Sequence, residues 1–293
     1  MNGAVWAWRD AGEFFEFDGH RIFYRRQGGG PTVLLVHGYP FGSYEWHRIW
    51  DGLTANFDVI APDMLGMGFS DKPIRSRYGL LMHADMHEAL LRYLGVDRCA
   101  VVGHDLGVSV VQEMLARRCD DPTLPSIDAA VFLNGGLFAE AYRPRPIQKI
   151  LSSPAGHLIG PLLPRSAIGD AVAGLFGPDA KPTKADLEPL LDLLRHNGGR
   201  YVSHIVGRFV EERRRLRDRL VRPLIDNVVP MTFVNGMADP NSGAHMAARY
   251  RELVPNPQVV ALHGVGHWPH IEAPDATAQS ILGFLSRTER GTA

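Results

Sequence analysis

The sequence predicts an α/β protein with a mostly parallel, twisted sheet flanked by helices and a helical cap inserted before the penultimate strand. Short apolar runs alternate with helix-compatible segments over the first ~135 residues, which is typical of strand and helix succession in such proteins. Almost a hundred residues then separate two further apolar runs. An unstructured loop of that length is improbable in a compact domain, so the intervening stretch is expected to fold by itself.

The chain should begin its sheet with a hairpin. Residues 13–18 and 20–26 are two aromatic-rich runs, and they meet at Asp18-Gly19. This dipeptide favours a tight turn between antiparallel strands. We therefore predict that the two runs pair with each other.

The remaining strands are predicted from continuous apolar runs rather than from alternation. Such runs are typical of parallel strands that are buried on both faces. Helical spacing of apolar residues places helices between and after them. The predicted strands are 31–38, 58–62, 99–103, 129–134, 229–235 and 258–262, and the predicted core helices are 80–94, 108–118 and 275–287.

The insertion is predicted to span residues 138–225 and to form a helical cap over one end of the sheet. Residues 184–196 and 201–220 carry its helix-compatible patterns, and no clear strand lies between them. Residues 1–137 and 226–293 then make up the core. The charge run at residues 211–219 is interpreted as a solvated helix face with pairs at i,i+4 spacing.

Composition excludes several functional classes. The 293 residues are 45% hydrophobic and 22% charged, with a net charge of −1, so no charge excess favours nucleic acid or a membrane surface. Cys99 and Cys119 are too few for a disulfide framework. The first eighteen residues lack the features of a secretory signal, and no apolar stretch reaches membrane length. A cytoplasmic protein is expected, with no metal or organic cofactor.

The motif Gly103-His104-Asp105-Leu106-Gly107 joins a predicted strand to a predicted helix. Small residues on both sides of Asp105 relieve crowding in a sharp turn of this kind. The start of the helix favours an anion, because its amides and its dipole face the side chain there. Asp105 is therefore the candidate nucleophile.

Five motifs in order resemble the α/β-hydrolase fold family, and the aspartate resembles its epoxide hydrolase and haloalkane dehalogenase branch. Four other stretches are similar to the mesoderm-specific transcript subgroup of that branch. The family motifs are 37–40, 63–73, 103–107, 236–239 and 264–274, and the subgroup stretches are 43–46, 68–73, 134–138 and 143–146.

The nucleophile type indicates the reaction. A carboxylate that attacks an acyl carbon gives a reactive anhydride, whereas attack on a saturated carbon gives a stable ester that water can cleave. Asp105 thus favours a small apolar electrophile such as an epoxide or an alkyl halide. His267 would be the general base for the hydrolytic water. Asp239 would orient His267, matching the order of the family, and Asn134 holds the alternative acid position without a charge.

The resemblance also implies an oxyanion hole from the backbone N–H groups of Tyr39 and Leu106. Tyr39-Pro40 is expected to be a cis peptide, as in relatives. His37, Pro40, His104 and Trp268 are expected to line the substrate pocket.

The leaving group would distinguish the alternatives. The preferred hypothesis is an epoxide hydrolase, which needs a proton donor for the alkoxide that leaves. The candidate donors in the cap are Tyr142, Tyr201 and His204, with His196 as a substitute. A haloalkane dehalogenase is the alternative, although Leu106 and Tyr39 stand where dehalogenases place halide donors. The third hypothesis is a catalytically silent, ligand-binding member of the fold. Water and a small substrate are the expected partners of a monomer or homodimer.

Overall fold

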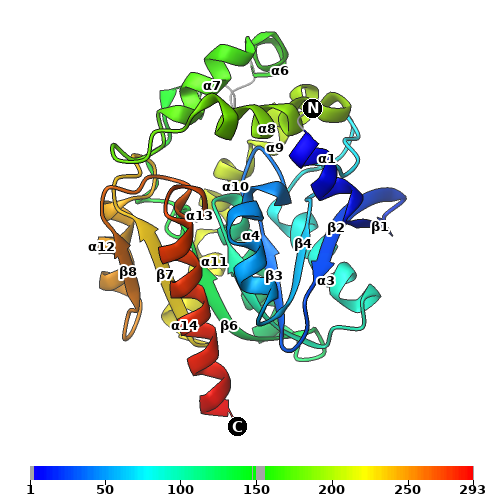
Figure 1. The fold of residues 1–293 in the computed structure, drawn as a ribbon. Coiled ribbons are helices and arrows are strands. Elements are labelled where there is room, and N and C mark those ends of the chain that lie inside the picture. Colours follow the sequence, from blue (N-terminus) through cyan, green and yellow to red (C-terminus); the bar gives the residue numbers. More distant parts are fainter. Residues whose placement is uncertain (1–2, 147, 150–155, 293) are drawn as a thin grey trace.

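A computed structural model describes residues 3–146, 148–149 and 156–292 and contains one eight-stranded sheet. The strand order is β1-β2-β4-β3-β5-β6-β7-β8 (Figure 1). The predicted hairpin forms, β2 pairs antiparallel with β4, and all later pairs are parallel. The strands are β1 Glu13–Phe17, β2 His20–Gln27, β3 Thr32–Val36, β4 Asp58–Pro62, β5 Arg98–Gly103, β6 Ser126–Phe132, β7 Met231–Gly236 and β8 Val259–Leu262.

Both faces of the sheet are buried, which explains the continuous apolar runs. Leu34 and Val36 belong to one hydrophobic cluster, whereas Val33 and Leu35 belong to the other. Successive side chains of a strand point to opposite faces, so each parallel strand supplies apolar residues to two layers. The helices of the core are α1 Gly3–Asp10, η1 Ser43–Arg48, α2 Trp50–Thr54, α3 Leu80–Tyr93, α4 Leu106–Asp120, α12 Ala244–Leu253, α13 Pro269–Glu272 and α14 Pro274–Thr292.

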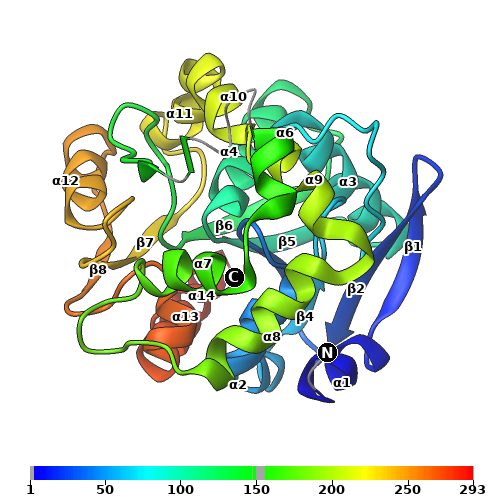
Figure 2. The same ribbon diagram turned by 90° about the horizontal axis from the view of Figure 1, so that it is seen from above.

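The segment between β6 and β7 is helical and lies largely over the edge of the sheet at which the parallel strands end (Figures 1 and 2). The pattern at 201–220 predicts one helix, but the chain breaks it into three, with interruptions at Gly207 and Leu216. Residues 147 and 150–155 of the predicted cap lie outside the described residues. The helices of this segment are α6 Gly156–Ile159, η2 Gly160–Leu162, α7 Arg165–Ala173, α8 Lys184–Arg195, η3 His196–Gly198, α9 Gly199–Val206, α10 Phe209–Arg215 and α11 Arg217–Ile225.

One side chain of α4 joins the beginning and the end of this insertion. The buried amide of Gln112 donates from Nε2 to the carbonyl oxygen of Leu137 at 3.0 Å and to that of Leu220 at 3.1 Å. Leu137 lies where the chain leaves the core, and Leu220 lies in α11 shortly before the chain returns to it. The helix that follows the Asp105 turn therefore holds both connections of the cap.

The N-terminal helix α1 was not predicted from the sequence. Val5 and Trp8 are its buried residues, and Trp8 Nε1 donates to Ser43 Oγ at 3.2 Å. The ring of Trp6 lies edge-on to that of His196, with 6.0 Å between the centroids. This helix thus contacts both the core and the end of α8. It was not predicted because its sequence is too short to show a helical spacing of apolar residues.

Within the described part of the chain, every helix is too short or too polar to cross a lipid bilayer. Cys99 is buried, Cys119 is exposed, and neither forms a disulfide.

Candidate active site

Asp105 stands in a strained turn between β5 and α4. Its backbone has φ 48° and ψ −106°, a left-handed conformation that non-glycine residues rarely adopt. A Cβ atom at Gly107 would collide with the carbonyl oxygen of Val36, and one at Gly103 would lie 2.9 Å from the carbonyl oxygen of Gly107. The two glycines predicted to relieve crowding therefore do so, and the turn presents the carboxylate at the end of the sheet.

Asp105, His267 and Asp239 form a row. Asp105 Oδ2 lies 3.4 Å from His267 Nε2, and His267 Nδ1 lies 2.8 Å from Asp239 Oδ2. The three side chains come from loops after β5, β8 and β7 and are almost fully buried. Because a carboxylate only accepts hydrogen bonds, Asp239 fixes a proton on Nδ1 and turns Nε2 towards Asp105.

Asp239 is itself held by three donors. Ser242 Oγ donates to Oδ2 at 2.6 Å, the backbone N–H of Asn241 donates to Oδ1 at 2.8 Å, and Asn134 Nδ2 donates to Oδ2 at 3.1 Å. Asn134, the alternative acid position, thus serves Asp239 as a hydrogen-bond donor. This shell leaves the carboxylate little freedom to turn away from His267.

The row favours charged side chains despite its burial. Burial raises the pKa of Asp105, but the hydrogen bond and charge of His267 outweigh this effect and lower it to about 2. Burial lowers the pKa of His267, but the Asp239 and Asp105 carboxylates outweigh it and raise it to about 10. The pKa of Asp239 is lowered as well, because His267 outweighs burial there. An ionised carboxylate is the state that a nucleophile requires.

The loop after β3 brings a backbone donor to Asp105. The N–H of Tyr39 lies 3.2 Å from Asp105 Oδ1, and Tyr39-Pro40 is a cis peptide. Leu106 is the first residue of α4, so its N–H has no partner within the helix. The Tyr39 N–H contacts the Asp105 carboxylate, and the oxyanion hole predicted from Tyr39 and Leu106 stays a prediction.

A cavity of about 150 Å³ opens between the Asp105 turn and the cap. Pro40, Tyr142, His204 and Trp268 line it, together with Asp105 and His267. Most of the other lining residues are apolar, and they include Leu163, Ile168, Val172, Leu175, Leu194, Phe209 and Val210.

Three predicted positions lie elsewhere. Tyr201 is 45% exposed, does not line the cavity and contacts Arg200 in the first turn of α9. His37 does not line the cavity, since its Nε2 accepts the N–H of Met64 at 2.9 Å. His104 does not line it either; its ring is buried beneath the turn.

Comparisons with known proteins agree with this architecture. Residues 31–152 match the model of the alpha/beta hydrolase fold family. The mesoderm-specific transcript protein of Mus musculus is 34% identical to this chain over 300 residues, which cover 98% of the chain and 89% of that protein. The chain belongs to the alpha/beta hydrolase fold family.

Other proteins are similar to this chain in sequence or in fold. The putative hydrolase LipZ of Mycobacterium tuberculosis is 34% identical over 283 residues, covering 96% of this chain and 98% of LipZ. A haloalkane dehalogenase from Bradyrhizobium elkani superposes with a TM-score of 0.81 at 20% identity, covering 96% and 99% of the two chains. The epoxide hydrolase CorEH superposes with a TM-score of 0.69 at 22% identity, covering 94% and 98%. At these identities the two structures show the fold alone.

The side chain of Tyr39 is a cavity residue that the sequence analysis treated only as a backbone donor. Its hydroxyl lies 2.7 Å from Ser203 Oγ, and burial raises its pKa to about 12. In comparison, the Tyr142 hydroxyl accepts from Asn241 Nδ2 and from Gln148 Nε2, each at 3.3 Å. Two protonated phenols thus face the cavity that contains Asp105.

Arg213 corrects the interpretation of residues 211–219 as a solvated face. It is 2% exposed, its Nε donates to Ser109 Oγ at 2.7 Å, and its guanidinium lies over the rings of Tyr142 and Phe209. Phe209 and Arg213 are four residues apart, so they share one helix face. That spacing is the signal in the sequence that places Arg213 on the buried side.

Proposed function

We propose that this hydrolase cleaves epoxides through a covalent ester on Asp105 and releases vicinal diols. The observation that carries the proposal is the position of the Asp105 carboxylate. It lies at the wall of an apolar cavity that Tyr39 and Tyr142 also line, and it is held ionised beside His267. An apolar cavity with a few convergent polar groups suits a small apolar substrate.

In the first half-reaction, Asp105 Oδ2 attacks an epoxide carbon and the ring C–O bond breaks. The epoxide oxygen leaves as an alkoxide and takes a proton from a cavity tyrosine, for which Tyr142 and Tyr39 are the candidates. Their raised pKa values keep both phenols protonated at neutral pH. His204 also lines the cavity, but burial lowers its pKa, so its ring is neutral and a weaker proton donor.

In the second half-reaction, His267 Nε2 takes a proton from water, and the hydroxide attacks Cγ of the Asp105 ester. The carbonyl oxygen becomes an oxyanion close to the backbone N–H groups of Tyr39 and Leu106. The Tyr39 N–H already lies 3.2 Å from Oδ1, which supports this assignment. Collapse of the tetrahedral intermediate breaks the bond between Cγ and Oδ2, the proton of the attacking hydroxide passes to the departing diol oxygen, and the carboxylate returns. Asp239 stabilises the imidazolium until His267 gives its proton back, through solvent, to the tyrosinate left by the first half-reaction.

Dehalogenation of alkyl halides is the second candidate. The indole of Trp268 lines the cavity, and its buried Nε1–H has no partner among the described residues, so it is available as a halide donor. A dehalogenase stabilises its leaving halide with such N–H groups. The positions of Leu106 and Tyr39 offer no second side-chain N–H, and this favours epoxides.

The test is to trap the ester. His267→Gln should accumulate an Asp105 adduct when offered a panel of terminal epoxides, internal epoxides and haloalkanes, and intact-mass spectrometry with peptide mapping reads the adduct and its site. The matched control, His267→Gln combined with Asp105→Asn, should show no adduct. Halide release would favour the second candidate. Saturable binding without adduct or turnover would contradict both and indicate a ligand-binding protein.

A further inference from the structure

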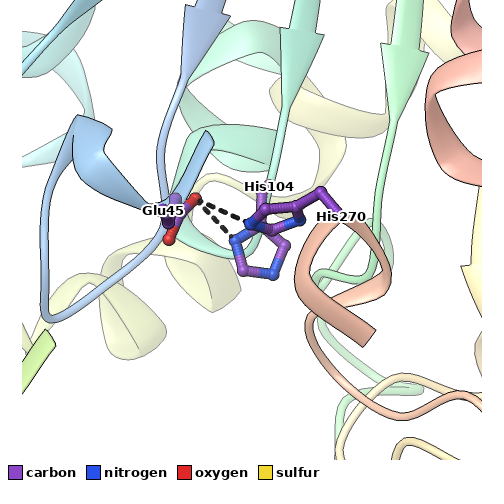
Figure 3. A group of neighbouring side chains, drawn as sticks. All are labelled: Glu45, His104 and His270. Carbon is purple, nitrogen blue, oxygen red and sulfur yellow. Dashed lines mark hydrogen bonds and ion pairs between the residues drawn. The ribbon is translucent and has the colours of Figure 1, made fainter. Parts of the chain in front are cut away.

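Beneath the Asp105 turn lies a buried carboxylate, Glu45, that the proposed mechanism does not use. Glu45, His104 and His270 are all 0% exposed, and Figure 3 shows the carboxylate facing both imidazole rings. Glu45 Oε1 lies 2.9 Å from His104 Nδ1 and accepts the backbone N–H of Gly38 at 2.9 Å. His270 Nε2 is 3.8 Å away, beyond hydrogen-bonding distance.

Both ring nitrogens of His104 face acceptor atoms. His104 Nε2 lies 2.9 Å from the carbonyl oxygen of His267, and a carbonyl oxygen can only accept, so Nε2 carries a hydrogen. Nδ1 faces Glu45 Oε1 at 2.9 Å, and this oxygen also accepts the Gly38 N–H. Two acceptors around one imidazole are the arrangement that a doubly protonated ring would satisfy.

The groups that face His104 are Glu45, the neighbouring Asp105, and the rings of His267 and His270, whose centroids lie 5.1 Å and 4.6 Å from its own. Burial lowers the pKa of His270 well below its usual value, so that ring is neutral.

We propose that Glu45 is a positioning residue that holds His104 as an imidazolium and thereby fixes three parts of the active site. Through the Gly38 N–H it holds the loop that carries the Tyr39 donor. Through His104 it holds the residue next to Asp105 and the backbone carbonyl of His267. The inference rests on the proposed function, because it assigns these three parts to nucleophile, oxyanion donor and base.

A metal ion is the competing interpretation of the same cluster. Donor atoms of Glu45, His104 and His270 lie within 4.8 Å of one another. Tetrahedral zinc ligands at bonds of about 2.0 Å lie roughly 3.3 Å apart. The 2.9 Å between Glu45 Oε1 and His104 Nδ1 is shorter and matches a charge-assisted hydrogen bond, so the proton explains this contact better.

The protonation of His104 can be measured without any substrate. In wild-type protein near neutral pH, ¹⁵N NMR of the imidazole side chains should show both His104 nitrogens protonated, with His104→Gln identifying the signals. In Glu45→Gln, one nitrogen should lose its proton. An unprotonated nitrogen in the wild type, or a stoichiometric divalent metal in the purified protein, would overturn the proposal. This readout is independent of turnover, so its failure is distinguishable from failure of the proposed function.

The positioning role is measured on the two half-reactions. Glu45→Gln should slow hydrolysis of the Asp105 ester by roughly 10- to 100-fold, as expected for loss of a buried hydrogen bond, and kcat and KM should fall together because a slower second step lets the ester accumulate. Glu113→Gln is the matched control, since Glu113 is 1% exposed but binds Arg117 and Arg219 on α4 and α11. If the two variants hydrolyse the ester equally fast, Glu45 has no positioning role.

Discussion

Arg213 donates from Nη2 to the backbone carbonyl oxygen of Asp105, at 3.4 Å, from a position that is fully enclosed by protein. Within the described residues no carboxylate forms an ion pair with this guanidinium. Its positive charge therefore acts on the Asp105 side chain and contributes to the low pKa of that group. The insertion thus supplies a cation to the proposed nucleophile as well as a wall to the cavity.

Replacing Arg213 with methionine keeps a long side chain but removes this charge. We expect hydrolysis of the Asp105 ester to slow about tenfold, because this step turns a neutral ester into an oxyanion on Asp105, and a unit charge several ångströms away contributes about 1–2 kcal/mol at an effective dielectric constant of about 20. Arg214→Met, at the exposed neighbouring position, is the control. Single-turnover measurement of adduct decay gives the rate, and equal rates for the two variants would contradict the electrostatic role.

Asp239→Asn should block the second half-reaction more than the first. An amide at this position can donate to Nδ1, which would place the imidazole proton on Nε2, where the base must be free. We expect hydrolysis of the ester to fall by roughly 10³–10⁴-fold, as for the equivalent change in serine hydrolases. The adduct should then accumulate in a burst equal to the enzyme concentration. A uniform loss of both steps would point to disrupted folding, which circular dichroism detects.

Tyr142→Phe should slow opening of epoxides by roughly 10²-fold, because it removes a general acid from the cavity. Turnover of an alkyl halide needs no such proton and should stay unchanged. Tyr201→Phe is the control, since that side chain lies outside the cavity and is 45% exposed. If Tyr142→Phe is silent and Tyr39→Phe carries the loss, the proton comes from the Ser203-bound phenol instead.

The two half-reactions should depend differently on pH. Asp105 has a pKa of about 2, so it is ionised and ester formation should be flat between about pH 5 and 8. Hydrolysis requires neutral His267, whose pKa of about 10 reflects two adjacent anions. Ester formation neutralises one of them, so the pKa falls below 10 in the intermediate and hydrolysis should accelerate as pH rises through that value. Single-turnover measurements would refute this assignment if hydrolysis were independent of pH.

The sheet and the row of Asp105, His267 and Asp239 could be predicted from the sequence for one physical reason. Parallel strands buried on both faces leave continuous apolar runs, and the residues that follow them gather at one edge of the sheet. Asp105, Asp239 and His267 each follow such a run. Local chain order therefore sufficed to bring three distant residues together.

The buried charges were not accessible in the same way. Glu45 and His104 are 59 residues apart, and Arg213 and Ser109 are 104 residues apart. At such separations the sequence gives no sign that the two members of either pair are in contact. A charged residue in a polar helix pattern is ordinarily exposed. The sequence likewise did not separate the candidate donors Tyr142 and Tyr201, of which only Tyr142 lines the cavity.

The Gln112 side chain binds the backbone at both ends of the insertion, so these two ends are held at fixed points on α4. A change of sequence within the insertion can then alter the cavity wall while the Asp105 carboxylate keeps its position. Substrate selectivity would depend on the insertion and reactivity on the Asp105 turn, so the two properties can change independently of each other.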